Sequence, residues 1–179
     1  MELTEEMCAK LCARALEMRK YSYVPYSNFR VGAALLSAGG QVYAGCNIEN
    51  AAYTPSVCAE RTAFFRAVSE GEREFTAIAI AGGATSESEM ASAHFAGGVM
   101  ESQRLDWRES VLPEYCAPCG VCRQVMAEFC RPDFQILLVR SRTDWRVMTL
   151  GQLLPESFGP GNLKEGAEQH GQHRWEKTV

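Results

Sequence analysis

Two stretches of this sequence decide its fold, Cys58-Ala59-Glu60 and, further along the chain, Pro118-Cys119-Gly120-Val121-Cys122. Cysteine thiolates are zinc ligands, and a catalytic zinc ion keeps three protein ligands and leaves its fourth position to water. A glutamate two residues after the first thiol is placed to carry the proton that such a water releases. We therefore predict that Cys58, Cys119 and Cys122 bind Zn²⁺ and that Glu60 is a catalytic proton carrier.

Each of these stretches falls where a helix is expected to begin. Apolar residues recur at helical spacing after Cys58, which predicts a helix from 58 to about 68, and after Cys119, which predicts a helix from 119 or 120 to about 130. Free backbone N–H groups and the positive end of the helix dipole favour a thiolate over a thiol there. Because three thiolates leave Zn²⁺ with a net negative charge, a nearby cation is expected, and Arg61 and Arg123 are the candidates.

The other apolar segments alternate between helical and strand patterns. These expected elements are an amphipathic helix over 4–18, a hairpin of 31–37 and 41–45, a buried strand over 75–81, strands over 134–139 and 145–149, and a short helix up to 154. Helices that alternate with apolar strands predict an α/β sandwich with a mixed sheet.

Length and composition are those of one folded domain. A chain of 179 residues, of which 46% are hydrophobic, can bury a core without disulfides. We assign residues 1–163 to a single domain and expect the polar tail 164–179 to be disordered. Residues 84–115 form an inserted segment whose six acidic residues and two arginines account for the whole net charge of −4.

The inserted segment is expected to hold a short helix from 100 to 112 around Trp107 and Val111, stopped by Pro113. It ends directly before Pro118, so it is expected to emerge near the mouth of the site or at a subunit interface. Either it is a surface elaboration without a role, or it forms a lid or an interface wedge built around Trp107.

Charge and cysteine content exclude several classes of protein. A net charge of −4 without a basic cluster argues against a nucleic-acid polymer as partner. No stretch approaches the ~18 apolar residues of a membrane helix, and the acidic N-terminal sequence is not a secretory signal. Eight cysteines then indicate free thiols and metal ligands in a reducing compartment, so we expect a cytoplasmic protein with Cys8, Cys12 and Cys130 in its core.

A purely structural zinc site is the alternative, because such sites normally close the coordination shell with four ligands. Cys116 or Cys46 could be the fourth ligand. The three histidines lie in the inserted segment or the tail and are poor candidates: His94, His170 and His173. The place of Glu60, two residues after a ligand, favours the catalytic interpretation.

The sequence resembles the small homotetrameric cytidine deaminases of pyrimidine salvage. The similarity runs from about 7 to 163 without the inserted segment, and the zinc motif alone would indicate only the wider deaminase superfamily. The motifs that carry it are Tyr26-Ser27-Asn28-Phe29-Arg30-Val31-Gly32-Ala33-Ala34-Leu35-Leu36, Gly45-Cys46-Asn47-Ile48-Glu49-Asn50-Ala51-Ala52-Tyr53, Cys58-Ala59-Glu60-Arg61-Thr62-Ala63, Pro118-Cys119-Gly120-Val121-Cys122-Arg123-Gln124 and Leu153-Leu154-Pro155.

This resemblance implies a three-layer α/β/α sandwich around a mixed five-stranded sheet. It also implies hydrolytic deamination of cytidine and deoxycytidine to uridine and deoxyuridine, with release of ammonia. In that reaction Glu60 takes a proton from zinc-bound water, the hydroxide attacks carbon 4 of cytosine, and Glu60 delivers protons to ring nitrogen 3 and to the departing amino group.

The resemblance further implies which residues hold the nucleoside. Phe29 packs on the pyrimidine, and Ala59 is a further substrate contact. Asn47 and Glu49 bind the ribose 3′-hydroxyl, which we expect to need a buried polar pair beside the apolar ring.

Other residues would act on the ligands or across subunits. Arg61 matches an arginine that neutralises the charge of the thiolates. Gln124 matches a position that surrounds the metal ligands without binding the metal itself. Ala52 and Tyr53, together with Phe158, match residues that reach the site of a neighbouring subunit in a homotetramer.

Three other functions fit parts of the pattern. A blasticidin-type deaminase shares the fold and the zinc chemistry, but the run Asn47-Ile48-Glu49-Asn50 together with Phe29 favours cytidine. An editor that flips bases out of a polynucleotide is disfavoured by the acidic charge. A zinc-stabilised module without chemistry is disfavoured by Glu60 and by the open fourth coordination position.

Overall fold

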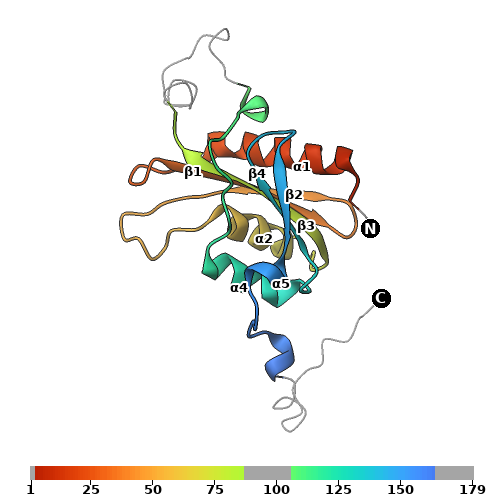
Figure 1. Ribbon diagram of the computed structural model, residues 1–179. Coiled ribbons are helices and arrows are strands. Elements are labelled where there is room, and N and C mark those ends of the chain that lie inside the picture. Colours follow the sequence, from red (N-terminus) through yellow and green to blue (C-terminus); the bar gives the residue numbers. More distant parts are fainter. Residues whose placement is uncertain (1–2, 87–105, 164–179) are drawn as a thin grey trace.

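The computed structural model describes residues 3–86 and 106–163, which form a five-stranded sheet in the order β2-β1-β3-β4-β5 (Figure 1). β3 and β4 are parallel and all other neighbours are antiparallel, so the sheet is mixed, as predicted. The strands are β1 Phe29–Ser37, β2 Val42–Cys46, β3 Phe75–Ala84, β4 Gln135–Val139 and β5 Trp145–Thr149. β3 extends three residues beyond the expected end at Ala81.

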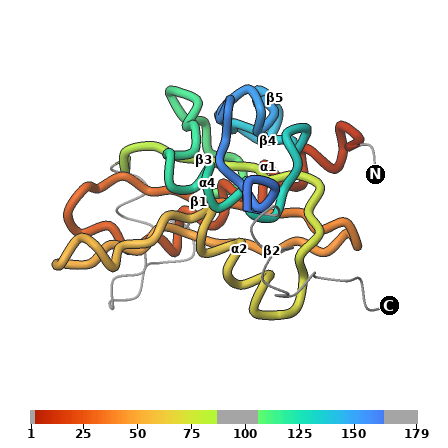
Figure 2. The backbone as a smooth tube through the Cα atoms, turned by 90° about the horizontal axis from the view of Figure 1, so that it is seen from below, coloured from red at the N-terminus to blue at the C-terminus, as the bar shows by residue number. Residues whose placement is uncertain are grey.

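Helices cover both faces of the sheet. α1 lies on one face, and α2 and α4 lie on the other, which gives three layers (Figures 1 and 2). The α-helices are α1 Glu5–Met18, α2 Ala59–Ser69, α4 Gly120–Phe129 and α5 Leu150–Leu153, and the 3-10 turns are η1 Arg19–Tyr21, η3 Trp107–Glu109 and η4 Pro160–Leu163. The predicted sandwich is therefore confirmed. In the described part of the chain, no helix is long and apolar enough to cross a membrane.

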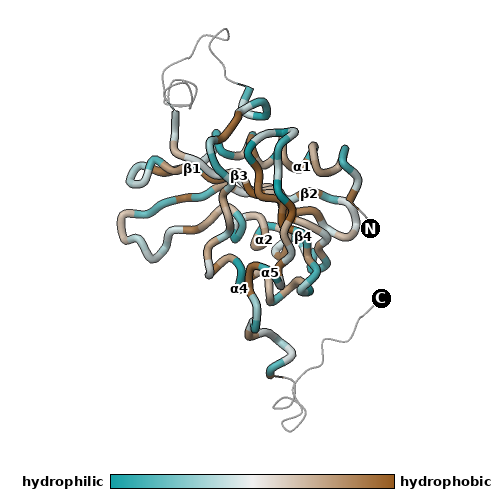
Figure 3. The backbone as a smooth tube through the Cα atoms, in the orientation of Figure 1, coloured by the Kyte–Doolittle hydropathy of each residue, from teal (hydrophilic) through white to brown (hydrophobic). Residues whose placement is uncertain are grey.

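The two faces of β3 explain the layers. Ile78 and Ile80 point into the core shared with α2 and α4, whereas Ala77, Ala79 and Ala81 point toward α1. Successive side chains of a strand alternate between faces, so one apolar strand supplies both cores. The most hydrophobic residues accordingly lie along the strands in the centre of the molecule (Figure 3).

Two of the covering helices, α1 and α2, approach the sheet at a glycine. A Cβ atom added to Gly32 would collide with the carbonyl oxygen of Ala15 in α1. One added to Gly45 would lie 2.5 Å from the carbonyl oxygen of Ala59 and 2.6 Å from the backbone nitrogen of Ala63, both in α2. The helices can lie this close only because neither strand position carries a side chain.

The expected helix from 100 to 112 is wrong where the structure describes it, since residues 106–112 hold only the turn η3. Trp107 is buried on the α1 side, with the guanidinium groups of Arg19 and Arg30 at 5.7 and 5.9 Å from its ring centre. Val111 is 72% exposed instead of sharing an apolar helix face with it. This placement contradicts a lid built on Trp107. Residues 87–105 lie outside the described residues. The tail 164–179, for which disorder was expected, also lies outside them.

Candidate active site

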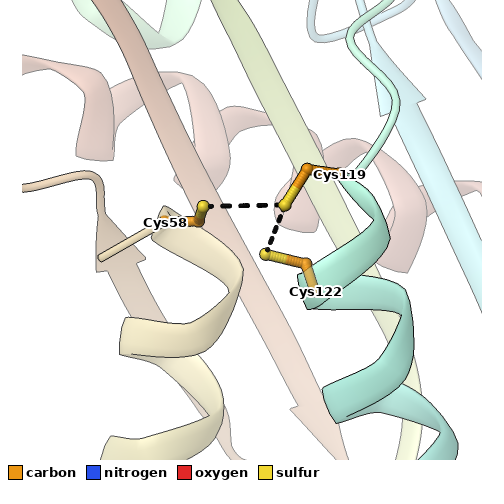
Figure 4. Close-up of side chains that lie close together, drawn as sticks. All are labelled: Cys58, Cys119 and Cys122. Atoms are coloured by element: carbon orange, nitrogen blue, oxygen red, sulfur yellow. Dashed lines mark hydrogen bonds between the residues drawn. The ribbon is translucent and has the colours of Figure 1, made fainter. Parts of the chain in front are cut away.

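Three thiols meet where two helices begin. Cys58 is the N-cap of α2, Cys119 is the N-cap of α4, and Cys122 lies in the first turn of α4. Figure 4 shows the three side chains pointing toward one another. The Sγ atoms of Cys58 and Cys119 are 3.8 Å apart, and those of Cys119 and Cys122 are 3.5 Å apart.

This arrangement fits a zinc ion. Thiolates that bind one zinc at about 2.3 Å in tetrahedral geometry lie about 3.8 Å from one another. All three Sγ atoms lie within 4.8 Å of one another, and soft thiolates are ligands that zinc prefers. Cys58, Cys119 and Cys122 could therefore hold the metal, and a fourth position would remain for water.

The surroundings of Cys58 favour its thiolate form. The pKa of Cys58 is lowered to about 5, first by its hydrogen bond with Cys122 and then by the guanidinium of Arg61. The hydrogen bond between these two thiols in turn raises the pKa of Cys122. Arg61 Nη2 lies 3.7 Å from Cys58 Sγ and donates to the Ser56 carbonyl at 3.0 Å, so the positive charge is held at the ligand.

Arg123, the other candidate cation, has a different role. It donates to the carbonyl oxygens of Pro118 at 2.7 Å and Leu153 at 2.8 Å. Arg123 therefore braces the loop that carries Cys119, and the prediction that it compensates the thiolates is not supported. Gln124 donates to the carbonyl oxygen of Phe158 at 2.8 Å, which ties the C-terminal aromatic residue to α4.

Glu60 lies in the first turn of α2 and is only 4% exposed. Burial, followed by the negative charge of Cys58, raises the pKa of its carboxyl to about 7. A carboxyl with a pKa near neutrality can both accept and donate a proton under physiological conditions. Glu60 thus has properties that suit a proton carrier, the role that the sequence predicts for it.

The structure gives no support to a closed site with four ligands. Among the described residues, the one group of potential ligands close enough to hold a metal is the cluster of three thiols, and neither Cys46 nor Cys116 belongs to it. Burial, and then the charge of Glu60, raise the pKa of Cys116 to about 11, so its thiol is uncharged near neutral pH. The three histidines lie outside the described residues.

Asn47 and Glu49 shape the loop that presents Phe29. Asn47 accepts a hydrogen bond from the Val31 amide at 2.8 Å and donates to the Phe29 carbonyl at 2.9 Å. Glu49 accepts from the Tyr26 amide at 2.9 Å. Asn47 and Glu49, which were expected to form a buried pair, are only half-buried, because both side chains hydrogen-bond to this loop. The Phe29 ring is 40% exposed.

The residues expected to reach a neighbouring subunit are exposed. Tyr53 is 74% exposed and has a left-handed backbone (φ 57°), and its ring meets that of Tyr26 edge-on at 6.0 Å. It lies beside Ala52 in the loop of residues 47–57, which projects beyond the sheet (Figures 1 and 2). Phe158 is exposed after α5. Ala59, by contrast, is fully buried at the start of α2.

Sequence reasoning missed the location of Cys116. Its side chain lies against Gly82 in β3, and the ring of Phe29 lies on the same side of that glycine. A cysteine three residues before a ligand suggests a competing ligand, and only the position of β3 shows that the thiol packs against Gly82 instead. Arg123 was missed as a brace for a similar reason, since its carbonyl partners come from the segment before α4 and from the end of α5.

Three converging thiols beside a buried carboxyl of raised pKa have the layout of a metal-dependent hydrolase. Comparisons with known proteins agree. The family model for the cytidine and deoxycytidylate deaminase zinc-binding region matches residues 6–138. The chain therefore belongs to the cytidine and deoxycytidylate deaminase family of zinc-dependent hydrolases, as its resemblance predicted.

Individual relatives are similar over almost the whole chain. The cytidine deaminase of Sporosarcina psychrophila is 42% identical, with 89% of this chain and 97% of the relative aligned. That of Halalkalibacterium halodurans is 40% identical over 87% of this chain and 96% of its own length. The crystal structure of cytidine deaminase from Burkholderia pseudomallei, 39% identical, covers 87% of this chain and 100% of its own with a TM-score of 0.65.

Proposed function

We propose that this protein hydrolyses cytidine and deoxycytidine to uridine and deoxyuridine and releases ammonia. One observation carries the proposal: the buried carboxyl of Glu60 follows the first of three thiols that converge from two helix ends. The relatives described above are named cytidine deaminases, which supports this substrate class.

The reaction adds water across the bond between carbon 4 and ring nitrogen 3 of cytosine. The amino group on carbon 4 is then expelled. When bound by Cys58, Cys119 and Cys122, zinc would supply a Lewis acid that lowers the pKa of water enough to form hydroxide near neutral pH. Glu60 accepts the proton that the water loses and delivers it to ring nitrogen 3. A second proton passes through Glu60 to the amino group, which leaves as ammonia once oxygen is bonded to carbon 4.

The remaining residues hold the nucleoside and the charge of the site. We assign the exposed Phe29 ring to the pyrimidine, and Asn47 and Glu49 to the ribose 3′-hydroxyl. We also assign the backbone at Ala59, between the first thiol and Glu60, to contact with the base. Arg61 offsets the negative charge of the thiolates through its contact with Cys58.

The variant Glu60→Gln tests the reaction and the proton carrier together. The amide cannot shuttle protons, so we expect kcat for cytidine to fall about 10³-fold, while zinc content stays unchanged. Ultraviolet absorbance follows conversion to uridine. Glu70→Gln, the same chemical change at the other end of α2, is the control and is expected to keep full activity. Comparable turnover by Glu60→Gln and wild type, or no turnover by zinc-loaded wild type, would contradict the proposal.

The variant Glu49→Ala tests the assignment to ribose. Loss of a hydrogen bond to the 3′-hydroxyl is expected to lower kcat/KM for cytidine by the equivalent of about 1–3 kcal/mol. Because 3′-deoxycytidine lacks that hydroxyl, the same variant is expected to lose much less with it. Equal losses for the two nucleosides would indicate that Glu49 only orders its loop.

We also propose a cytoplasmic homotetramer that acts in pyrimidine salvage, in which Ala52, Tyr53 and Phe158 approach the site of another subunit. The exposure of both aromatic side chains and the projecting loop support this assembly. Light scattering on the purified protein is expected to give the mass of four chains, and a monomer would contradict the shared sites. Cell fractionation tests the compartment.

A further inference from the structure

Cys116 and the ring of Phe29 lie on the same side of Gly82, a residue of the central strand that has no side chain. A Cβ atom added to Gly82 in β3 would lie 2.6 Å from Cys116 Sγ, 2.8 Å from Cys116 Cβ and 3.2 Å from Phe29 Cε1. A contact of 2.6 Å is far inside van der Waals distance, so Cys116 occupies space that any side chain at position 82 would need. The thiol fills that space beside the ring.

The chain around Cys116 is fixed in place. The hydroxyl of Tyr115 donates to Asp144 Oδ1 at 2.6 Å, and the guanidinium groups of Arg140 and Arg146 lie 5.5 and 4.7 Å from the centre of its ring. Pro118 is fully buried on the other side. The thiol therefore has little freedom to withdraw from Gly82.

The ring of Phe29, by contrast, needs support. Its backbone is held by Ser27, whose hydroxyl accepts from the Phe29 amide at 3.1 Å, and by Asn47, which binds its carbonyl. These bonds fix the main chain but leave the orientation of a 40% exposed ring to the atoms packed against it.

We propose that Cys116 is a positioning residue that sets the Phe29 ring against the pyrimidine base, and that Gly82 is needed because it makes room for the thiol. The inference rests on the proposed function, since it takes Phe29 as one wall of the base site. Cys116 acts here as a small, uncharged and polarisable packing group, without contact with the reacting atoms.

A set of four variants tests this role: Cys116→Ala, Cys116→Ser, Gly82→Ala and the double variant Gly82→Ala/Cys116→Gly. Removing the sulfur frees the ring, so Cys116→Ala is expected to raise KM for cytidine and Kd for uridine about fivefold with kcat within about twofold. Cys116→Ser keeps most of the volume and is expected to stay near wild type. Zinc content is expected to remain unchanged in all four.

The double variant gives the sharpest result. Gly82→Ala alone forces the thiol and the ring apart and is expected to raise KM about tenfold or more. In the double variant Gly82→Ala/Cys116→Gly the new methyl group takes the space that the whole cysteine side chain leaves, so KM is expected to return to within about twofold of wild type. Spectrophotometric kinetics, calorimetric binding of uridine and zinc analysis are the readouts.

Three outcomes would overturn the inference. These are a double variant no better than Gly82→Ala, a loss of zinc in Cys116→Ala, which would make Cys116 a ligand, and a fall in kcat without a change in KM. If wild type does not convert cytidine at all, the proposed function fails separately. The packing of Cys116 against Gly82 is then tested by free energies of unfolding. A double variant that is more stable than Gly82→Ala supports this packing, whereas a double variant that loses the sum of the two single losses refutes it.

Discussion

On one face of the sheet α1 lies across Gly32, and on the other face α2 lies across Gly45. α1 contains cysteines and α2 begins directly after one, but these cysteines behave differently. Cys12 lies in the middle of α1, where burial raises the pKa of its thiol to about 12. Cys58 lies at the first residue before α2, where hydrogen bonds and a nearby guanidinium lower its pKa to about 5.

The surroundings of each thiol explain this difference. Cys12 is enclosed among apolar core residues, which disfavour its charged form, whereas the Cys122 thiol and the Arg61 guanidinium stabilise the thiolate of Cys58. The α1 face therefore supplies stability, and the face of α2 and α4 carries the candidate metal site. Each prediction below sets one face against the other.

The largest expected effect is on the metal site. Cys122→Ala removes one of three ligands, so zinc content is expected to fall from about one ion per chain to nearly none, and turnover of cytidine to fall with it. Metal analysis of the purified variant measures this. The matched change Cys12→Ala on the α1 face is expected to keep zinc and activity and to cost about 1 kcal/mol in the free energy of unfolding. Zinc loss in both variants would remove the distinction between the faces.

A smaller effect is expected where the helices touch the sheet. Gly45→Ala would push the first turn of α2 outward and displace Cys58 and Glu60 with it. Since a displacement of about 1 Å in a catalytic group can cost about 10²-fold, we expect kcat/KM to fall by that order. Gly32→Ala should destabilise the protein by about 1–3 kcal/mol without a comparable loss per folded molecule. Kinetics normalised to bound zinc separate the two, and equal activity losses would contradict this difference.

The smallest effect concerns an ion pair on α1. Glu17 loses some solvation, but its bonds to Arg14 at 2.7 Å and Lys20 at 3.1 Å outweigh this and lower its pKa. A lowered carboxyl pKa stabilises the fold above the unfolded value of about 4.3 and loses this contribution as the pH falls. Glu17→Gln is therefore expected to cost about 0.5 kcal/mol at neutral pH, and less in acid.

Urea unfolding at several pH values measures the effect of Glu17→Gln. The exposed Glu128 on α4, which has no ion pair in the described part of the chain, provides the control variant Glu128→Gln. A cost that grows as the pH falls would show that the sign is wrong. Zinc content should not change in either variant.

The sequence predicts the structure well where a local signal dominates. Thr4 caps α1 by accepting from the Met7 amide, and Gly40 allows the positive φ of the hairpin turn between β1 and β2. The motifs at Cys58 and Cys119 mark the starts of α2 and α4, so the metal cluster is also predictable. These features depend on neighbours in the chain, which a sequence displays directly.

Features that depend on distant partners were not predictable. Trp107 does not join a helix, because contacts with Arg19 and Arg30 from other elements outweigh its local helical pattern. Arg123 follows Cys122 directly, but adjacent residues of a helix point in different directions, so its guanidinium reaches Pro118 and Leu153. The exposure of Asn47 and Glu49 likewise depends on the loop that they hold.

The two ligand-bearing helices also have a consequence for the length of the chain between them. A metal bound by Cys58, Cys119 and Cys122 cross-links α2 to α4 and closes a loop that contains β3 and the residues between β3 and α4. The entropy cost of closing a flexible loop rises only slowly with its length, by about 0.6 kcal/mol for each doubling. The cross-link thus lets this part of the sequence gain residues at little thermodynamic cost, while the site itself stays fixed.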